Sequence, residues 1–86
     1  MNLQTLGVND ATIEVTSIDS RGFWLYVHGQ EHFLPFDIFS WFANATIRQI
    51  SHVEQQGPDH FHWPDLDVDL TLDTIDNPEK YPLRFR

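Results

Sequence analysis

The stretch that decides the fold reads Trp63-Pro64-Asp65-Leu66-Asp67-Val68-Asp69-Leu70-Thr71-Leu72. Aliphatic and acidic side chains alternate along it at the period of a β-strand, in which successive side chains point to opposite faces. We therefore predict one strand with an aliphatic face in the core and an acidic face in water. The inward residues are Leu66, Val68, Leu70 and Leu72, and the outward residues are Asp65, Asp67 and Asp69. The rest of the chain is expected to pack onto this strand.

Size and composition predict one domain over residues 1–86, with a single modest core. Seven Phe, three Trp and two Tyr supply that core. The chain has no cysteine, which excludes disulfides, thiolate zinc sites and thiol nucleophiles and fits a reducing compartment. No apolar run approaches the ~20 residues of a membrane span, and the first residues lack the regions of a signal peptide. We expect a cytoplasmic protein.

The net charge is strongly negative. Thirteen Asp and Glu against five Lys and Arg give a formal charge of −8. This sign opposes binding to a phosphate backbone, so we predict no direct contact with nucleic acid. The same field would speed encounter with a basic protein.

Local patterns predict an α+β fold in which a small antiparallel sheet packs against one or two short helices. β-branched and aromatic runs separated by turn residues indicate an N-terminal three-strand meander, followed by later strands. The meander strands are residues 12–18, 23–28 and 31–35, and the later strands are residues 53–56, 60–63 and the acidic stretch.

Helical spacing and capping residues predict two helices between the meander and the later strands. The first follows Asp37 through residue 42, and the second follows Asn44 to about residue 52, with Ala43, Ile47 and Ile50 toward the sheet. A helical turn is expected over residues 73–76. Residues 1–10 are expected to form a flexible arm and residues 77–86 an extended tail.

The sequence resembles the bacterial domain-of-unknown-function 2442 family across about residues 12–83. The most specific shared motif is Trp-Pro-x-Leu-Asp-Val-Asp-Leu, here residues 63–70, and the aromatic run Trp41-Phe42-Ala43-Asn44-Ala45-Thr46 is the next. Further matching segments are Gly22–Leu25, Phe33–Phe36 and Asn77–Leu83. The resemblance implies a small α+β domain, often encoded beside a short partner reading frame in an arrangement similar to toxin–antitoxin pairs and mobile-element cassettes. It implies no agreed activity.

Metal and catalytic motifs are weak. Asp65, Asp67, Asp69, Asp73 and Asp76 have some of the spacing of a calcium loop, but Leu70 stands where that loop needs glycine. His60 and His62 share a strand face without a recognisable third ligand. No Gly-x-Ser-x-Gly elbow or glycine-rich phosphate loop is present. We therefore predict no catalytic residues, no metal and no cofactor.

The leading hypothesis is a non-enzymatic protein-interaction module, the antitoxin-like or accessory member of a small gene pair. Its partner would be a small basic protein, or a second copy in a homodimer. Aromatic side chains would provide affinity and the acids would steer encounter. The predicted contact residues are Trp24, Tyr26, Trp41, Phe42, Trp63, Asp65, Asp67 and Asp69.

Two alternatives stay open. One is a metal-dependent, hydrolase-type site built on Asp67, Asp69 and His62. The other is a self-associating accessory domain, in which an open strand edge or an aromatic patch pairs with its own copy.

Overall fold

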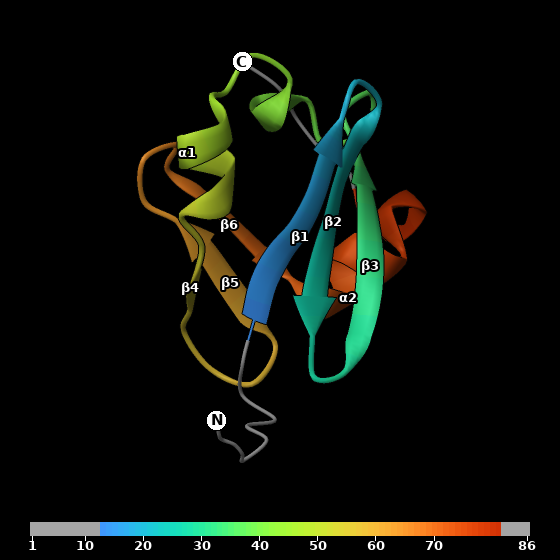
Figure 1. Cartoon of the computed structure of the whole chain (residues 1–86). Helices are drawn as coiled ribbons and strands as arrows, with labels where there is room; N and C mark the ends of the chain where they lie inside the picture. The colour runs from blue at the N-terminus through green and yellow to red at the C-terminus, as the bar shows by residue number, and fades with distance from the viewer. Residues whose placement is uncertain (1–12, 82–86) are drawn as a thin grey trace.

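The N-terminal half folds as the predicted meander. In the computed structural model, which describes residues 13–81, β1 (Ile13–Asp19), β2 (Gly22–Val27) and β3 (Gln30–Pro35) form an antiparallel sheet in the order β1-β2-β3 (Figure 1). We call it the meander sheet. His28 and Gly29, both with positive φ (51° and 86°), form the tight turn between β2 and β3. The predicted arm over residues 1–10 and the tail residues 82–86 lie outside the described residues.

Alternation along β2 and β3 directs one face of the meander sheet into the core. Phe23, Leu25 and Leu34 are fully buried on this inner face, and Val27 is 1% exposed. Cross-strand pairing places Phe23 opposite Leu34 and Leu25 opposite His32. The intervening residues of both strands point to the opposite, outer face.

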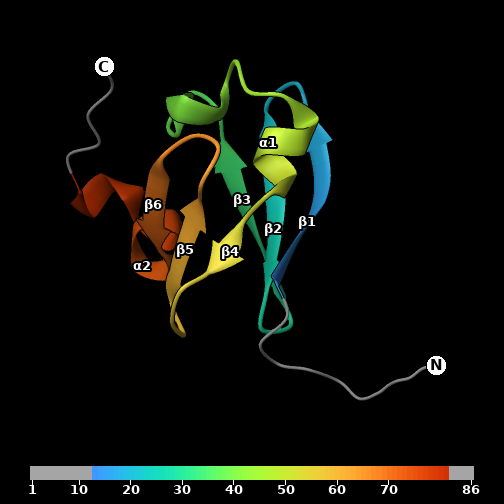
Figure 2. The same ribbon diagram turned by 90° about the vertical axis from the view of Figure 1, so that its left-hand side faces the viewer.

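A second antiparallel sheet closes the core. It contains β4 (Glu54–Gln55), β5 (His60–Trp63) and β6 (Val68–Thr71), in the order β4-β5-β6. Figure 2 shows it beside the inner face of the meander sheet. Phe61, Trp63, Val68 and Leu70 are buried and belong to the same core cluster as the inner residues of β2 and β3. The α+β class and the predicted architecture are confirmed.

Trp63 is the largest fully buried side chain of this core. Its ring packs edge-on against Phe42 at a centroid distance of 5.0 Å and against Phe23 at 6.2 Å. Its indole N–H donates a hydrogen bond to the Ile50 carbonyl oxygen over 2.9 Å. Trp63 therefore joins both sheets to the segment between them, and its polar atom is satisfied inside the core.

The predicted strand over residues 63–72 was wrong in its extent. The chain folds back after Trp63 as a β-hairpin, in which Trp63 pairs with Val68 and residues 64–67 form the loop. Pro64 suits a turn because its φ is fixed, the Leu66 N–H donates to the Trp63 carbonyl, and Asp67 takes a positive φ of 56°. Only Val68–Thr71 is strand, and there the expected burial alternation is observed.

The strand ends where a helix begins. Thr71 caps α2 (Leu72–Asp76), because its hydroxyl accepts a hydrogen bond from the Thr74 N–H. Leu72 is thus the first helical residue rather than an inward strand residue, and it is partly buried. A short 3-10 helix, η2 (Pro78–Lys80), follows α2.

The two central helices are shorter than predicted. Residues 36–39 form turns, in which Ile38 and Phe39 donate to the Pro35 carbonyl, and only Ser40–Phe42 is helical, as the 3-10 helix η1. Asp37 therefore caps no helix. α1 (Ile47–Ser51) begins after Thr46, which forms a capping box with Gln49.

The predicted inward face of α1 was also wrong in part. Ile50 is 2% exposed, but Ile47 is 71% exposed and Ala43 lies outside the helix and is exposed. Within residues 13–81 no helix has the length and apolar character needed to cross a bilayer.

Replacing Trp63 by Phe is expected to lower the free energy of unfolding by about 2–4 kcal/mol, since it leaves a void and an unpaired buried carbonyl. Urea unfolding of W63F and the parent chain measures this. The matched control is W24F, because the Trp24 ring lies on the outer face of the meander sheet and is 37% exposed, and we expect a loss of no more than ~1 kcal/mol. Equal unfolding midpoints for W63F and W24F would contradict the central role of Trp63.

Candidate functional site

The outer face of the meander sheet carries the main cluster of accessible aromatic side chains. We call it the aromatic face. The register places two cross-strand rows on it. It consists of Ser17, Trp24 and Phe33 in one row, Glu14, Tyr26 and Glu31 in the next, and Thr16 beside them. In Figures 1 and 2 no helix or strand among residues 13–81 covers this face.

Trp24 and Phe33 form the apolar centre of the aromatic face. They are cross-strand partners, with ring centroids 5.1 Å apart and planes tilted by 45°. Trp24 remains 37% exposed, and Phe33 and Tyr26 are partly buried. Rigid aromatic side chains that are held on a strand provide a large contact area at small entropic cost, as is typical of binding hot spots.

Carboxylates flank the aromatic centre. Glu14 and Glu31 lie on either side of Tyr26 in the same cross-strand row. β1 contains a bulge between Val15 and Ser17, and the extra residue, Thr16, donates its hydroxyl hydrogen bond to a Glu31 carboxylate oxygen over 2.7 Å. The bulge therefore fixes one carboxylate above the sheet. The face combines exposed aromatic rings with negative charge.

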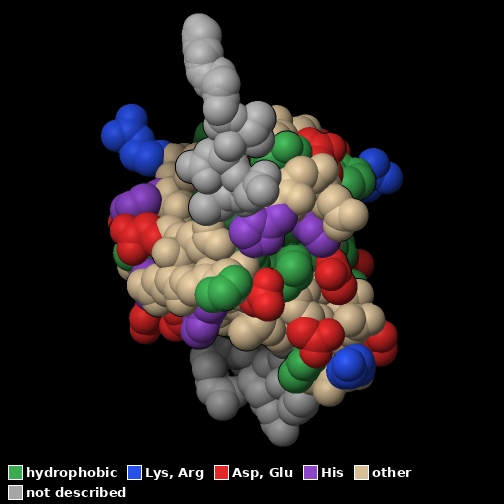
Figure 3. Space-filling view, turned by 90° about the horizontal axis from the view of Figure 1, so that it is seen from below, with side chains coloured by type: hydrophobic (Ala, Val, Ile, Leu, Met, Phe, Trp, Pro, Cys, Tyr) green, Lys and Arg blue, Asp and Glu red, His purple; other side chains and the backbone are tan. Residues whose placement is uncertain are grey.

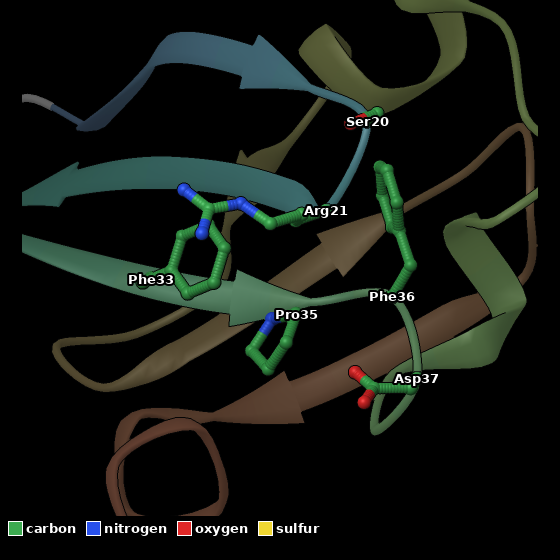
Figure 4. A pocket seen from close by; sticks show the side chains of 6 residues that line it. All are labelled: Ser20, Arg21, Phe33, Pro35, Phe36 and Asp37. Atoms are coloured by element: carbon green, nitrogen blue, oxygen red, sulfur yellow. The ribbon is translucent and has the colours of Figure 1, made fainter.

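A hollow of about 420 Å³ continues the aromatic face at the β1–β2 turn. Figure 4 shows Arg21 extending toward Phe33, with Phe36 and Asp37 at the opposite end. The turn itself is fixed by Asp19, whose side chain accepts hydrogen bonds from the backbone N–H groups of Arg21 (2.8 Å) and Gly22 (3.2 Å). The lining residues are Ser20, Arg21, Phe33, Pro35, Phe36 and Asp37. An apolar floor with one cation and one carboxylate suits a side chain of a protein partner.

The close packing of Phe33 and the Leu34 carbonyl against Gly22 leaves no room for a side chain at residue 22. A Cβ atom on Gly22 would lie 2.8 Å from Phe33 Cζ and 2.3 Å from the Leu34 carbonyl oxygen. We expect G22A to lower the free energy of unfolding by about 2 kcal/mol or more, because a backbone atom cannot move aside easily. Thermal unfolding measures the effect, with S20A, an exposed change in the same turn, as the control. A G22A chain as stable as S20A would contradict the close packing described here.

Five of the predicted contact residues fall into three environments. Trp24 and Tyr26 lie on the aromatic face. Trp41 is partly buried, with its ring centroid 6.4 Å from that of Phe39. Phe42 and Trp63 were wrong as surface contacts, because both are fully buried in the core, where Phe42 packs edge-on against Phe23 at 4.9 Å.

The three aspartates do not form a row. Asp65 lies in the β5–β6 loop, where it binds His52 Nδ1 at 2.8 Å, and Asp67 is exposed in the same loop. Asp69 lies on β6, on the outer face of the second sheet, and binds His62 Nδ1 at 2.7 Å. Within residues 13–81 no group of three or more His, Asp or Glu side chains is placed to hold a metal ion.

Histidines of the described region pair with carboxylates on several elements. His52 also lies 3.6 Å from Glu54, the cross-strand neighbour of His62. Besides the two pairs above, His32 Nδ1 lies 2.7 Å from Asp76 Oδ1, which joins β3 to α2. His60 Nε2 lies 3.6 Å from the Asp69 carboxylate. Figure 3 shows histidine and acidic side chains interspersed over the face seen from below. The His32–Asp76 pair joins residues 44 positions apart, whereas His62 and Asp69 are cross-strand neighbours in the β5–β6 hairpin, and none of the pairs lines the hollow beside Phe33.

The pair between His52 and Asp65 changes the pKa of the histidine. The hydrogen bond and the charge of Asp65, with a further contribution from Glu54, raise the pKa of His52 above its usual 6.5. The pair therefore contributes its full stabilisation below the unfolded value, and this contribution is lost as pH rises through the folded pKa.

Replacing Asp65 by Asn is expected to lower the pKa of His52 toward 6.5, because the partner loses its charge. An NMR titration of the His52 ring measures this, and D67N serves as the control, since Asp67 lies in the same loop whereas the carboxylates paired with His52 are Asp65 and Glu54. A His52 titration curve that is the same in D65N as in the parent chain would contradict the pairing.

Comparison with known proteins identifies the chain. The model of a family of proteins of unknown function, DUF2442, matches residues 12–81. The chain belongs to the DUF2442 family. No curated protein matches it, and no solved structure does. The most specific motif of this DUF2442 domain, residues 63–70, is the β5–β6 hairpin, so its tryptophan has a structural role in the core.

Proposed function

We propose that this DUF2442 domain is a non-enzymatic interaction module that binds a small basic protein through its aromatic face. One observation carries the proposal: Trp24, Tyr26 and Phe33 lie together on a sheet face that no described element covers. Aromatic side chains in this setting are typical anchors of protein interfaces.

The charge of the face supports a basic partner. Glu14 and Glu31 flank Tyr26, and the Thr16 hydroxyl holds the Glu31 carboxylate in place. A partner with Lys or Arg around an apolar centre would be steered by these carboxylates and by the net charge of the chain, −8. The family resemblance implies the corresponding role, which we include in the proposal: an antitoxin-like or accessory member of a small bacterial gene pair.

The histidine–carboxylate pairs support a structural reading over a catalytic one. His52 joins the end of α1 to the β5–β6 loop through Asp65, and His32 joins β3 to α2 through Asp76. Each of these pairs thus connects two elements, and neither lines the hollow beside Phe33. An acid–base site would instead bring such groups together around one substrate.

The proposal predicts that the aromatic face controls binding. The basic proteins encoded by the reading frames that flank this gene would be purified and titrated against the chain by calorimetry. We expect one of them to bind, and W24A to raise its dissociation constant roughly tenfold or more, since an interface tryptophan contributes upward of ~1.4 kcal/mol.

The matched control is I38A. Ile38 is also 37% exposed but lies in the turns after β3, outside the aromatic face, so its truncation is expected to leave binding unchanged. Added salt is expected to slow association of the parent chain, and less so of E14Q. Failure of every flanking product to bind, or equal losses in W24A and I38A, would contradict the proposal.

A further inference from the structure

The outer edge of β1 borders an open groove. In the order β1-β2-β3, β1 has a strand partner on one side only, and no described residue pairs with its other edge. α1 contacts β1 beside that edge. A hollow of about 320 Å³ lies between them, lined by the consecutive β1 residues 15–18 together with Ile47 and Ser51 of α1. An exposed strand edge next to a helix is a common site for strand addition.

The groove has one apolar and one acidic side. Ile47, 71% exposed, is the accessible aliphatic side chain of α1 on this hollow. On β1, Val15 and Ile18 point toward the core side, whereas Glu14 and Asp19 point to the outer face at the two ends of the groove. An added strand would therefore need apolar side chains on one face and cationic side chains on the other.

Residues 83–86 of the chain have this pattern. They read Leu83-Arg84-Phe85-Arg86, which alternates apolar and basic side chains at the strand period. They contain two of the five Lys and Arg residues of a chain with a net charge of −8. Paired with β1, Leu83 and Phe85 would face Ile47 while the two arginines faced the acidic side.

The groove and Tyr81, the last described residue before this segment, lie on opposite sides of one molecule. Figures 1 and 2 place α2 and η2 beyond β3, whereas the groove lies beyond β1 at the other edge of the meander sheet. The last described residue, Tyr81, has extended backbone angles (φ −126°, ψ 134°), and its hydroxyl is hydrogen-bonded to Asp73 of α2. The hydrogen bond to Asp73 therefore holds Tyr81 on the side away from the groove, which favours pairing between two copies.

We propose that residues 83–86 of one copy add as a strand to the edge of β1 of a second copy, in the groove beside Ile47. The exchange is reciprocal, so that each copy gives one strand and receives one, and the dimer closes with two-fold symmetry. This inference goes beyond the proposed function because it uses the edge of β1, which borders the aromatic face at Thr16 and Ser17, and names a different partner.

Sedimentation of four chains tests the proposal: the full chain, a chain ending at Tyr81, and the variants I47E and I38E. We expect the full chain and I38E to be dimers, the shortened chain to be a monomer, and I47E to dissociate with a constant raised roughly tenfold or more, since a charge replaces a buried aliphatic contact. Ile47 is exposed in the monomer, so its replacement does not threaten the fold.

A synthetic peptide of residues 81–86, added to the shortened chain, locates the contact by NMR. Shifts are expected at β1 residues 15–18 and at Ile47, and a peptide with Glu in place of both arginines is expected to produce none. A full chain that is monomeric throughout a concentration series overturns the proposal. A shortened chain that still forms dimers, or peptide shifts confined to other strands, overturns it equally.

Discussion

The structure depends on the packing of Trp63 between two thin sheets. Its ring contacts Phe42 and Phe23, and its N–H is satisfied by the Ile50 carbonyl. A chain of this size has one small core, so a single bulky side chain that touches every layer has a large share in holding the layers together. The hairpin that carries Trp63 also holds the Trp-Pro-x-Leu-Asp-Val-Asp-Leu stretch of residues 63–70, and the burial of Trp63 gives this stretch a structural role.

The small size of the chain also leaves the aromatic face exposed. The inner faces of the two sheets cover each other, and the helices are too short to cover an outer face as well, with α1 and α2 spanning five residues each. α1 lies at the β1 edge and α2 near β3 and β6. Trp24, Tyr26 and Phe33 therefore remain on a surface that a protein partner can use, beside the Glu31 carboxylate that Thr16 of the β1 bulge holds in place.

Polar pairs connect the elements around this core. His32 with Asp76 and His52 with Asp65 join segments that are 44 and 13 residues apart in sequence. Such pairs lie near the surface, where water weakens their electrostatic energy, so they position elements more than they stabilise them. Of the three aspartates of the acidic stretch, Asp65 and Asp69 thus pair with different histidines, and only Asp69 lies on a strand.

The sequence by itself determined the meander, the chemical class of the core and the acidic surface, because these depend on local periodicity and composition. The sequence came close to predicting the Trp24–Phe33 contact. A turn at His28 and Gly29 places these residues opposite each other, but strands predicted over residues 23–28 and 31–35 put the turn one residue later and shifted the register. Alternation past Pro64 likewise suggested one long strand where the chain turns.

Only the tertiary structure decided which aromatic residues are buried, since Phe42 and Trp63 look no different in sequence from Trp24. Burial depends on contacts between residues far apart in the chain, and local patterns do not contain them. The separation of Asp65 from Asp69, and the groove between β1 and α1, were decided in the same way, by how two sheets and a short helix pack.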